Sequence, residues 1–431
     1  MHIVREYILN PELVFKFRLS EKYFTRSRKQ TFSSTLLFMM NFLRKSLSFE
    51  IENFVKHIRS FIGNNSFLNF TKSAFVQCRN KIHPEVFKHL SNKLISEFYT
   101  DNDASIKLWK GFRLLAVDGS RMSLPNTKEL AKEYGRTKNQ NKPGNVQARV
   151  SVLYDVLNKY VIDGILSPLA IGEKDSAIKH LSFTQKNDLI IYDRGYPSFE
   201  IVYEHYERNL DFLIRVKKDF NNIVKKFYRE NHKSKIVKLY PGKNTKLSDK
   251  PYNKDTYVEI RLVRVELPNG ESEILMSSLR HTKKYPHSIF KELYALRWGV
   301  ETFYDEFKNK LKAEHFSGYS KQCILQDFYA ALFVSNVQTL IISDINEKLN
   351  ENSSTKYEYK VNNNLSYGFL KDRIVTLFFS GTDMDLVMSE LTELLKKHIV
   401  PIRPNRKFKV NKDKYRNKQK PKVPKNMKDT I

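Results

Sequence analysis

The amino-acid sequence predicts an α/β protein whose central part is built on a mixed β-sheet, with helical regions before and after it. Three observations support this prediction. The first hundred or so residues place apolar side chains with a period near 3.6, which is typical of amphipathic helices. From residue 106 on, apolar runs of strand length alternate with helical segments. After residue 285 the helical period returns, so a sheet-containing region separates two helical ones.

The helical N-terminal region is predicted to span residues 1–105. Apolar side chains recur at helical spacing between residues 36 and 43 and again between 54 and 61. A third helix is expected to begin at Thr71 or Ser73, because either hydroxyl can accept a hydrogen bond from a first-turn N–H. This helix carries lysine and arginine side chains. They suit either a sequence-specific DNA contact or a helical scaffold with a solvated basic face.

The first part of the core is predicted at residues 106–216. Three strand-like segments come first, at 112–117, 148–156 and 160–166, and a tight turn joins the last two. Helices and strands then alternate, with a helix at 176–184, a strand at 188–192, a helix at 198–208 and a strand at 212–216. Three strands followed by alternating helices and strands is the order of an RNase H-like core. We therefore expect an RNase H-like mixed sheet.

A β-rich insertion subdomain is predicted at residues 217–285, inside the core. The segment is rich in lysine and contains three strand-like stretches. Two acidic residues discussed below, Asp193 and Glu301, flank it at a separation of more than a hundred residues. A single helical crossover needs far fewer residues. An inserted subdomain accounts for the excess.

The chain after the insertion is divided into three segments. The second part of the core is predicted at 286–350, a helical C-terminal region at 351–400 and a basic tail at 401–431. Twelve of the 26 residues from Arg403 to Lys428 are Lys or Arg, with prolines between them. Such a segment cannot bury an apolar core, so we expect the tail to be disordered. It either clamps DNA non-specifically or only keeps the protein in solution.

The composition favours a polyanionic partner in a reducing compartment. The formal net charge is +28 and the isoelectric point is about 9.7, so neutralised phosphates would supply much of the affinity. An AT-rich genome accounts for part of the lysine excess. Cys78 and Cys323 lack metal-ligand spacing, which argues against a zinc finger or a disulfide framework. No secretory signal or uninterrupted apolar run of about 18 residues is visible, so we expect a soluble cytoplasmic protein.

Four polar side chains share one face of a helix predicted around residue 300. Tyr294, Arg297, Glu301 and Lys308 fall within a stripe roughly 60° wide at 100° per residue. The opposite side is expected to carry the apolar residues Leu296, Val300, Phe303, Phe307 and Leu311. A carboxylate between two cations suits a site that binds a metal ion and phosphates. Asp305, one turn further on, competes with Glu301 for the acidic role.

Two more carboxylates are predicted at the ends of buried strands. Asp118 follows an apolar run and precedes a glycine, and Asp193 follows another apolar run and precedes an Arg-Gly turn. Acids at strand ends reach the crevice where open α/β sheets form their sites. Together with Glu301 they could hold two divalent ions roughly 3.5–4 Å apart. Asp155 and Asp163, by contrast, are interpreted as surface or turn acids.

These three motifs together resemble those of bacterial insertion-sequence DDE transposases, in the family numbered four. The resemblance covers about residues 70–350 and rests on Val-Asp-Gly-Ser at 117–120, on Asp-Arg-Gly-Tyr at 193–196, and on the Tyr-Arg-Glu-Lys pattern. It implies that Asp118, Asp193 and Glu301 are the catalytic metal ligands, for two Mg²⁺ or Mn²⁺ ions. It also implies that Tyr294, Arg297 and Lys308 bind the phosphate beside the cut. Arg194 either touches DNA or braces the sheet.

The resemblance further implies cut-and-paste transposition on double-stranded DNA. Such an enzyme cleaves at the terminal inverted repeats of its element and transfers the 3′ ends to target DNA, working as a DNA-bound homodimer in the bacterial cytoplasm. It implies no membrane and no other protein partner. In some members an aromatic of the insertion stacks on a flipped base, but the last strand-like segment here, 272–278, has none. Trp298 is an alternative, although burial in the core is its expected role.

Two alternatives remain open at this point. One is a metal-dependent nuclease on a related fold that cuts DNA without strand transfer. The other is a transposase-derived DNA-binding protein that is no longer catalytic. The three carboxylates argue against the second alternative, since loss of one of them would have suggested it.

Overall fold

The computed structural model of the protein describes residues 1–26, 28–41, 43–62, 69–101, 105–137, 144–243, 245–267, 270–350, 357–379 and 381–403. The chain forms two compact units. Unit 1 comprises residues 1–16, 20–79 and 337–431, and unit 2 comprises 17–19 and 80–336. The basic tail predicted at 401–431 lies, from residue 404 on, outside the described residues.

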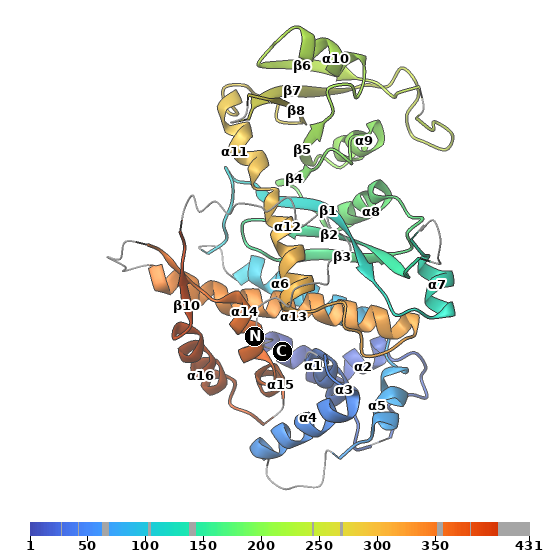
Figure 1. Cartoon of the computed structure of the whole chain (residues 1–431), viewed down its shortest axis with the longest axis vertical. Helices are drawn as coiled ribbons and strands as arrows, with labels where there is room; N and C mark the ends of the chain where they lie inside the picture. Colours follow the sequence, from blue (N-terminus) through green and yellow to red (C-terminus); the bar gives the residue numbers. More distant parts are fainter. Residues whose placement is uncertain are drawn as a thin grey trace, which may run out of the picture. The chain divides into compact units, whose positions relative to one another are not determined.

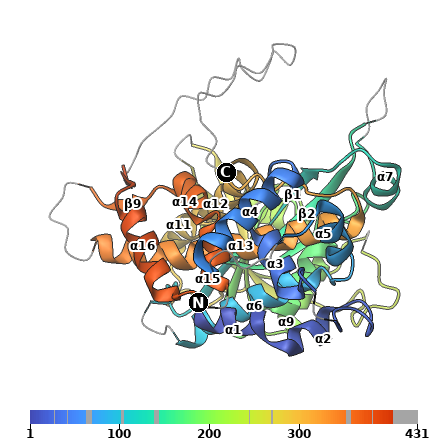
Figure 2. The same cartoon turned by 90° about the horizontal axis from the view of Figure 1, so that it is seen from below.

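Unit 1 is helical and joins the first and last parts of the chain. Its elements are α1 (His2–Leu9), α2 (Pro11–Phe17), α3 (Phe32–Met40), α4 (Leu47–Ile62), α5 (Lys72–Arg79), α14 (Asn363–Leu370), α15 (Arg373–Phe378), α16 (Met384–Lys396), and the short strands β9 (Tyr359–Val361) and β10 (Ile399–Pro401). The helix α15 contacts both α1 and α3, and Figure 2 shows these helices from below. Most of the helical region predicted at 1–105 therefore shares one unit with the predicted C-terminal region, whereas its last part, residues 80–105, belongs to unit 2.

Hydrogen bonds between side chains hold the N-terminal and C-terminal helices of this unit together. The Asn41 side chain donates to Asp372 at 2.9 Å, and the Lys371 ammonium donates to both carboxylate oxygens of the buried Glu50 at 3.1 Å. Buried carboxylates need such partners.

The predicted helix start is confirmed at Thr71, whose hydroxyl accepts from the Ala74 N–H at 3.1 Å.

Unit 2 contains a mixed eight-stranded sheet, shown in Figure 1. Its strands are β1 (Arg113–Ser123), β2 (Gln147–Asp155), β3 (Val161–Ser167), β4 (Asp188–Tyr192), β5 (Asp211–Val216), β6 (Ser234–Leu239), β7 (Val258–Glu266) and β8 (Ser272–Ser277), in the spatial order β3-β2-β1-β4-β5-β8-β7-β6. The strands β1, β2 and β3 pair antiparallel, and β4 and β5 run parallel to β1. This order and direction confirm the RNase H-like core predicted from the sequence.

The strands of the predicted insertion extend the core sheet rather than forming a separate one. The strand β8 pairs antiparallel with β5, with Val216 opposite Ile274, and β7 and β6 follow outward. The helix α10 (Asn222–Arg229) packs on β6 and β7. The open edge of β5 thus gains a hydrogen-bonded partner, as an otherwise exposed strand edge favours.

Helices cover this sheet, and two of them carry the segment with the Tyr-Arg-Glu-Lys pattern across it. They are α6 (Glu85–Asp101), α7 (Lys128–Tyr134), α8 (Glu173–His180), α9 (Phe199–Glu207), α11 (Phe290–Ala295) and α12 (Trp298–Asp305). The helix α11 contacts β7 and α12 contacts β1, so the segment crosses from the insertion to the first strand (Figure 1). Beneath α11, buried side chains from five strands surround Phe290 and Leu293. This packing fixes the height of the segment above the sheet.

The long helix α13 (Lys321–Asn350) runs from unit 2 into unit 1. Among the described helices, it is the one long and apolar enough to cross a membrane by length and composition. However, 78% of its most apolar window is buried within the protein, as in the core helix of a folded domain. The Asn336 amide donates to Ser91 at 2.8 Å and accepts from the Val161 N–H at 2.8 Å. Its polar side chains are therefore used within the fold.

Two acids interpreted as surface or turn residues are in fact buried. Asp155 accepts hydrogen bonds from the Asn158 N–H at 2.8 Å and from the Tyr99 hydroxyl at 2.5 Å. Asp163 contacts the Lys88 ammonium at 2.6 Å and the His180 ring at 2.7 Å. Asp155 is a turn acid, as interpreted, because the Leu157 and Asn158 N–H groups of the β2–β3 turn donate to it, although it is buried. The interpretation was wrong for Asp163, because its partners come from α6 and α8, which strand patterning alone does not place nearby.

Truncating Phe290 should destabilise unit 2. We expect Phe290→Ala to lower the free energy of unfolding by about 3–5 kcal/mol, since it leaves a cavity in fully buried packing. Urea unfolding followed by the fluorescence of Trp109, which packs against the same cluster, measures this change. Tyr206→Ala, at an exposed position on α9, is the control and should change stability by less than about 0.5 kcal/mol. Equal stability of the two variants would contradict the assignment of this core.

Candidate active site

The parallel register of β1 and β4 places two carboxylates side by side. Val117 lies opposite Tyr192, and the next residues are Asp118 and Asp193. Asp118 does not end its strand as predicted, because β1 continues to Ser123 through antiparallel pairing with β2. Only the pairing with β4 ends there, which opens a space beside the two acids. The two predicted acids thus lie side by side where β1 and β4 part, and β1 is longer than expected.

Two glycines follow these acids and leave room for a further carboxylate. A Cβ atom on Gly119 would lie 3.2 Å from the Glu173 side chain, and one on Gly195 would lie 3.7 Å from a Glu173 carboxylate oxygen. Glu173 forms an ion pair with Arg149 from β2. Sequence reasoning missed Glu173 because it opens α8, a helix with no motif of its own. The glycines that follow Asp118 and Asp193 were the features of the sequence that could have indicated a neighbouring side chain there.

The Tyr-Arg-Glu-Lys segment is not the single helix predicted. Residues 296–297 form a turn between α11 and α12, and a π-helical turn, Glu306–Lys310, follows α12. The Leu296 and Arg297 N–H groups bond three residues back, to Leu293 and Tyr294. Such bonds tighten the helix and rotate the positions that follow. Consequently Leu296, predicted on the apolar side, is 36% exposed.

The tightened turn brings the segment onto the strand acids. The Tyr294 hydroxyl donates to an Asp193 oxygen at 3.1 Å. The Arg297 guanidinium donates to Glu301 at 2.5 Å and lies 3.8 Å from an Asp118 oxygen. The Arg297 side chain is only 5% exposed, so its charge needs these nearby carboxylates as partners. The three predicted acids are therefore joined through Tyr294 and Arg297.

Two further side chains, Lys308 and Tyr304, fasten the segment to β1. The Lys308 ammonium donates to the Ser120 hydroxyl at 2.5 Å and to the Arg121 carbonyl at 2.6 Å. The Tyr304 hydroxyl donates to the Asp118 carbonyl at 2.8 Å. The sequence analysis did not identify Tyr304, because a buried tyrosine at helical spacing reads as part of an apolar face.

Burial perturbs the protonation of the site. Burial raises the pKa of Asp118 to about 6, and the Glu301 and Asp193 carboxylates add to the rise, while the Gly119 N–H and Arg297 oppose it. Burial, followed by the nearby Asp193 charge, also raises the pKa of the Tyr294 hydroxyl, which therefore stays a donor at neutral pH. Burial lowers the pKa of Lys308. The site thus concentrates negative charge that a cation would relieve.

The carboxylates of Asp118, Asp193 and Glu301 have the right chemistry to bind a divalent cation, but their side chains are not arranged around a common binding point. Carboxylate oxygens are the ligands that Mg²⁺ and Mn²⁺ prefer. Within the described residues, however, no three His, Cys, Asp or Glu side chains are grouped closely enough to hold a metal ion. Glu301 is engaged by Arg297 instead. A cation bound by all three acids requires Glu301 to exchange its arginine partner for the metal.

Three other residues considered from the sequence are exposed. Asp305 is exposed and accepts from Asn309 at 2.7 Å, so it does not compete with Glu301. Trp298 is 60% exposed, so its predicted burial was wrong. Arg194 is exposed in the turn after β4, and in the described part of the chain it forms no hydrogen bond or ion pair.

A second polar cluster has the geometry of a hydrolase triad but not its accessibility. The Ser151 hydroxyl lies 2.9 Å from the His180 ring, which lies 2.7 Å from Asp163. All three side chains are buried, and Lys88 neutralises the acid. No substrate reaches such a serine, so the cluster ties β2, β3 and α8 together.

The chain is similar in sequence to known proteins of one family. Residues 109–337, more than half of the chain, match the family described as "Transposase DDE domain". The transposase InsG for insertion sequence element IS4 of Escherichia coli (strain K12) is 21% identical over 287 residues. This match covers 64% of the chain and 61% of the relative, so the chain spans less than two thirds of that protein's length. A solved piggyBac transposase synaptic complex with hairpin DNA is 10% identical, with a TM-score of 0.43 over 97% of this chain and 89% of that one.

The raised pKa of Asp118 predicts that replacing this carboxyl with a neutral amide stabilises the fold, by an amount that depends on pH. Asp118→Asn should stabilise the protein at pH 8 by about 1–3 kcal/mol, because the folded wild type pays for an ionised, buried carboxylate above pH 6. At pH 4 the wild-type carboxyl is protonated in the fold and about half ionised in the unfolded chain, so the gain should fall to about 0.5 kcal/mol. Urea unfolding at both pH values measures it, with the exposed Asp305→Asn as control. A gain that is the same at both pH values would contradict the shift.

The engagement of Glu301 by Arg297 predicts competition with metal ions. In the absence of DNA, Arg297→Gln should raise the affinity for Mn²⁺ by roughly tenfold, because a cation within 4 Å of two carboxylates is removed. Electron paramagnetic resonance of free Mn²⁺ measures the affinity, and the exposed Arg194→Gln is the matched control. Unchanged or weaker binding by Arg297→Gln would show that the arginine does not compete with the metal.

Proposed function

The chain belongs to the family of transposase DDE domains, and we propose that it cuts DNA at the ends of its own element and joins the freed 3′ ends to target DNA. One observation carries this proposal. A helix-borne carboxylate, Glu301, is linked through Arg297 to Asp118, while the neighbouring Tyr294 holds Asp193. Three separate sequence motifs thereby meet at one point of an RNase H-like sheet.

Asp118, Asp193 and Glu301 would hold the divalent ions, two Mg²⁺ or Mn²⁺ per site. When bound, such ions activate an oxygen nucleophile and stabilise the leaving oxygen of a phosphodiester. The raised pKa of Asp118 is consistent with this role, because a cation favours the ionised form that burial disfavours. No covalent link between protein and DNA is needed for this chemistry.

The basic members of the segment would bind the phosphate at the cut. Arg297 would exchange its carboxylate partners for phosphate oxygens, which a guanidinium can grip in bidentate fashion. Lys308 is fixed beside Asp118 by Ser120 and would act as a point charge on the same strand. Tyr294 keeps Asp193 oriented through its hydroxyl. Arg194, which is exposed and has no partner in the described chain, would face the DNA.

The proposal includes the DNA partner, the oligomeric state and the cellular location. Double-stranded DNA, as element ends and as target, is the partner, and two ends must be paired, which implies a DNA-bound homodimer in the bacterial cytoplasm. The high positive charge supports a DNA partner. The helical region at 1–105 would recognise the element ends, and the tail at 401–431 would add non-specific affinity.

Cleavage and joining by defined variants test the proposal. On labelled DNA carrying the element's own ends, with Mg²⁺ or Mn²⁺, the wild type should release the ends and join them to a second duplex. Glu301→Gln and Asp193→Asn should lower both rates by roughly three orders of magnitude or more while still binding. Asp305→Asn is the control, an exposed acid one turn from Glu301 that should keep wild-type rates.

The same gel separates the alternatives. Cleavage without joined products would identify a metal-dependent nuclease. Specific binding without any cleavage by the wild type would identify a transposase-derived DNA-binding protein. Activity that survives in both acid variants would show that the metal ligands are wrongly assigned.

A further inference from the structure

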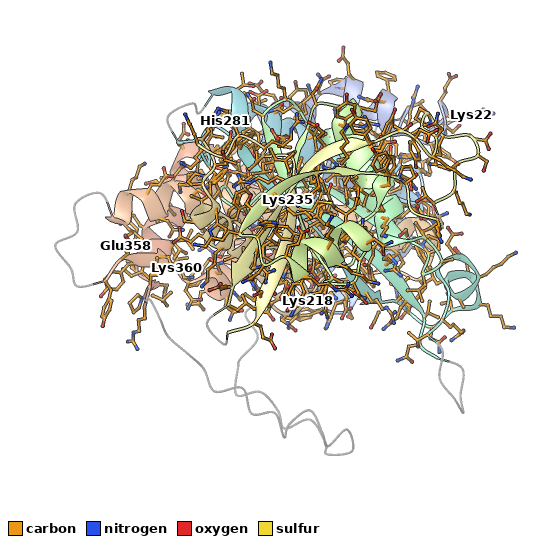
Figure 3. All side chains as sticks on the ribbon, turned by 90° about the horizontal axis from the view of Figure 1, so that it is seen from above. Lys22, Lys218, Lys235, His281, Glu358 and Lys360 are labelled. Carbon is orange, nitrogen blue, oxygen red and sulfur yellow. The ribbon has the colours of Figure 1, made fainter. Side chains whose placement is uncertain are left out.

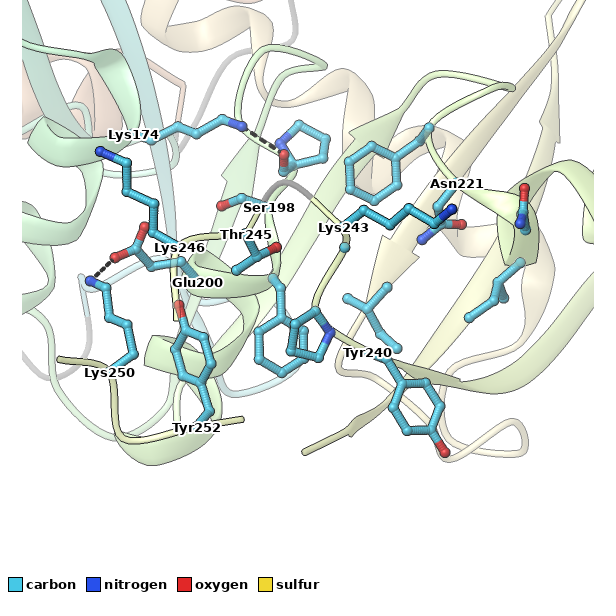
Figure 4. Close-up of a pocket in the computed structure, with 18 of the residues that line it drawn as sticks. Lys174, Ser198, Glu200, Asn221, Tyr240, Lys243, Thr245, Lys246, Lys250 and Tyr252 are labelled. Carbon is cyan, nitrogen blue, oxygen red and sulfur yellow. Dashed lines mark hydrogen bonds and ion pairs between the residues drawn. The ribbon is translucent and has the colours of Figure 1, made fainter. Parts of the chain in front are cut away.

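A wide groove opens beside the turn that follows Asp193. It has a volume of about 1060 Å³ and is bordered by the start of α9, the start of α10 and the loop after β6. Four lysines line it, at positions 174, 243, 246 and 250, and we call it the lysine groove (Figure 4). Resting on the proposed function, we propose that the lysine groove binds a single strand of DNA leading away from the active site.

The charge of the lysine groove selects a polyanion. Its two lining acids are already used, since Glu200 forms an ion pair with Lys250, and Asp175 accepts from the Gly172 N–H at 3.1 Å. Lys243 and Lys246 are exposed, and within the described residues they form no hydrogen bond or ion pair. Two ammonium groups are therefore available for phosphates.

The backbone of the groove adds to this preference for anions. Ser198 and Asn221 both line it, and each caps a helix, accepting from the Ile201 N–H at 3.2 Å and from the Val224 N–H at 2.8 Å. The positive ends of α9 and α10 therefore border the same space. Figure 4 shows Lys243 extending toward Asn221, on the side opposite Lys246 and Lys250. Positive groups thus line both sides.

Exposed aromatic rings favour a single strand over a duplex. Tyr240 lines the groove and is 43% exposed, and the ring of Tyr257, 44% exposed, lies 5.7 Å away. The Lys238 ammonium lies 4.1 Å from the Tyr257 ring. Unpaired bases stack on such rings while cations follow the backbone, whereas the bases of a duplex already stack on one another. Lys218 and Lys235 are further lysines of residues 217–285, labelled in Figure 3, and they contact Tyr228 and Glu230.

The position of the groove connects it to the site. Pro197 and Ser198 belong to its lining and come directly after the Asp193–Tyr196 turn. Lys174 also lines it, next to Glu173, whose carboxylate lies beside both motif glycines. A strand opened at the cut therefore meets the groove within a few residues of the two strand acids.

Binding by the full-length protein to a fluorescein-labelled single-stranded oligonucleotide, in EDTA, tests the proposal. Lys243→Gln combined with Lys246→Gln should weaken binding by about tenfold and lower the salt slope by about 1.4, since each phosphate contact in a single strand contributes roughly 0.7. Tyr240→Ala should weaken binding by roughly tenfold at an unchanged salt slope, because it removes stacking only. Lys128→Gln combined with Lys132→Gln, two exposed lysines of α7 outside the groove, is the matched control and should bind like the wild type.

Three results would overturn the proposal. They are unchanged affinity of the groove variants, an equal loss in the α7 control, and an equal loss for a blunt duplex, which would assign the groove to double-stranded DNA. Circular dichroism confirms that each variant is folded. Because EDTA prevents cleavage, the outcome is independent of catalysis. A wild type that never cuts DNA, with groove variants that lose single-strand binding, would refute the proposed function and leave this inference standing.

Discussion

The parallel pairing of β1 with β4 is the constraint on which the site depends. It sets Val117 against Tyr192, and therefore fixes the next residue of each strand, an aspartate in both cases, at one height. Everything else is arranged around that pair. The segment from α11 to α12 is held over it by the core around Phe290, and Lys308 fastens its far end to β1. A slip of one residue between these strands would turn one acid to the other face of the sheet.

Like charges collected in this way are costly, and the protein compensates them with its own side chains. Arg297 lies between two carboxylates and Tyr294 donates to the third. Those groups are also the ones suited to phosphate oxygens. In the free protein the acids and these proposed phosphate ligands satisfy each other, and on the proposed function the binding of cations and DNA would replace both sets of bonds together. This exchange offers a physical reason for a site that is assembled only when its substrates are present.

Much of the architecture could be predicted from periodicity, and the failures have physical causes. The strands at 188–192 and 212–216 and the helix at 198–208 were placed within one or two residues, because local patterning specifies them. The break in the helix at Leu296 was not predicted, because a tightened turn and an α-helix place polar residues at nearly the same spacing. Asp163 was misread because its partners come from distant helices. Glu173 and Tyr304 reach the site only through tertiary packing, which no single-sequence pattern encodes.

The pairing of β8 with β5 has a mechanical consequence. Because the insertion continues the sheet through backbone hydrogen bonds, it cannot swing as a hinged lid would without breaking that ladder. The strand β6, whose end borders the lysine groove, and the strands that carry the acids therefore belong to one continuous sheet. A strand seated in the groove would reach the acids after a fixed length of backbone, so the sheet itself would serve as a ruler that measures where along a DNA strand the cut falls.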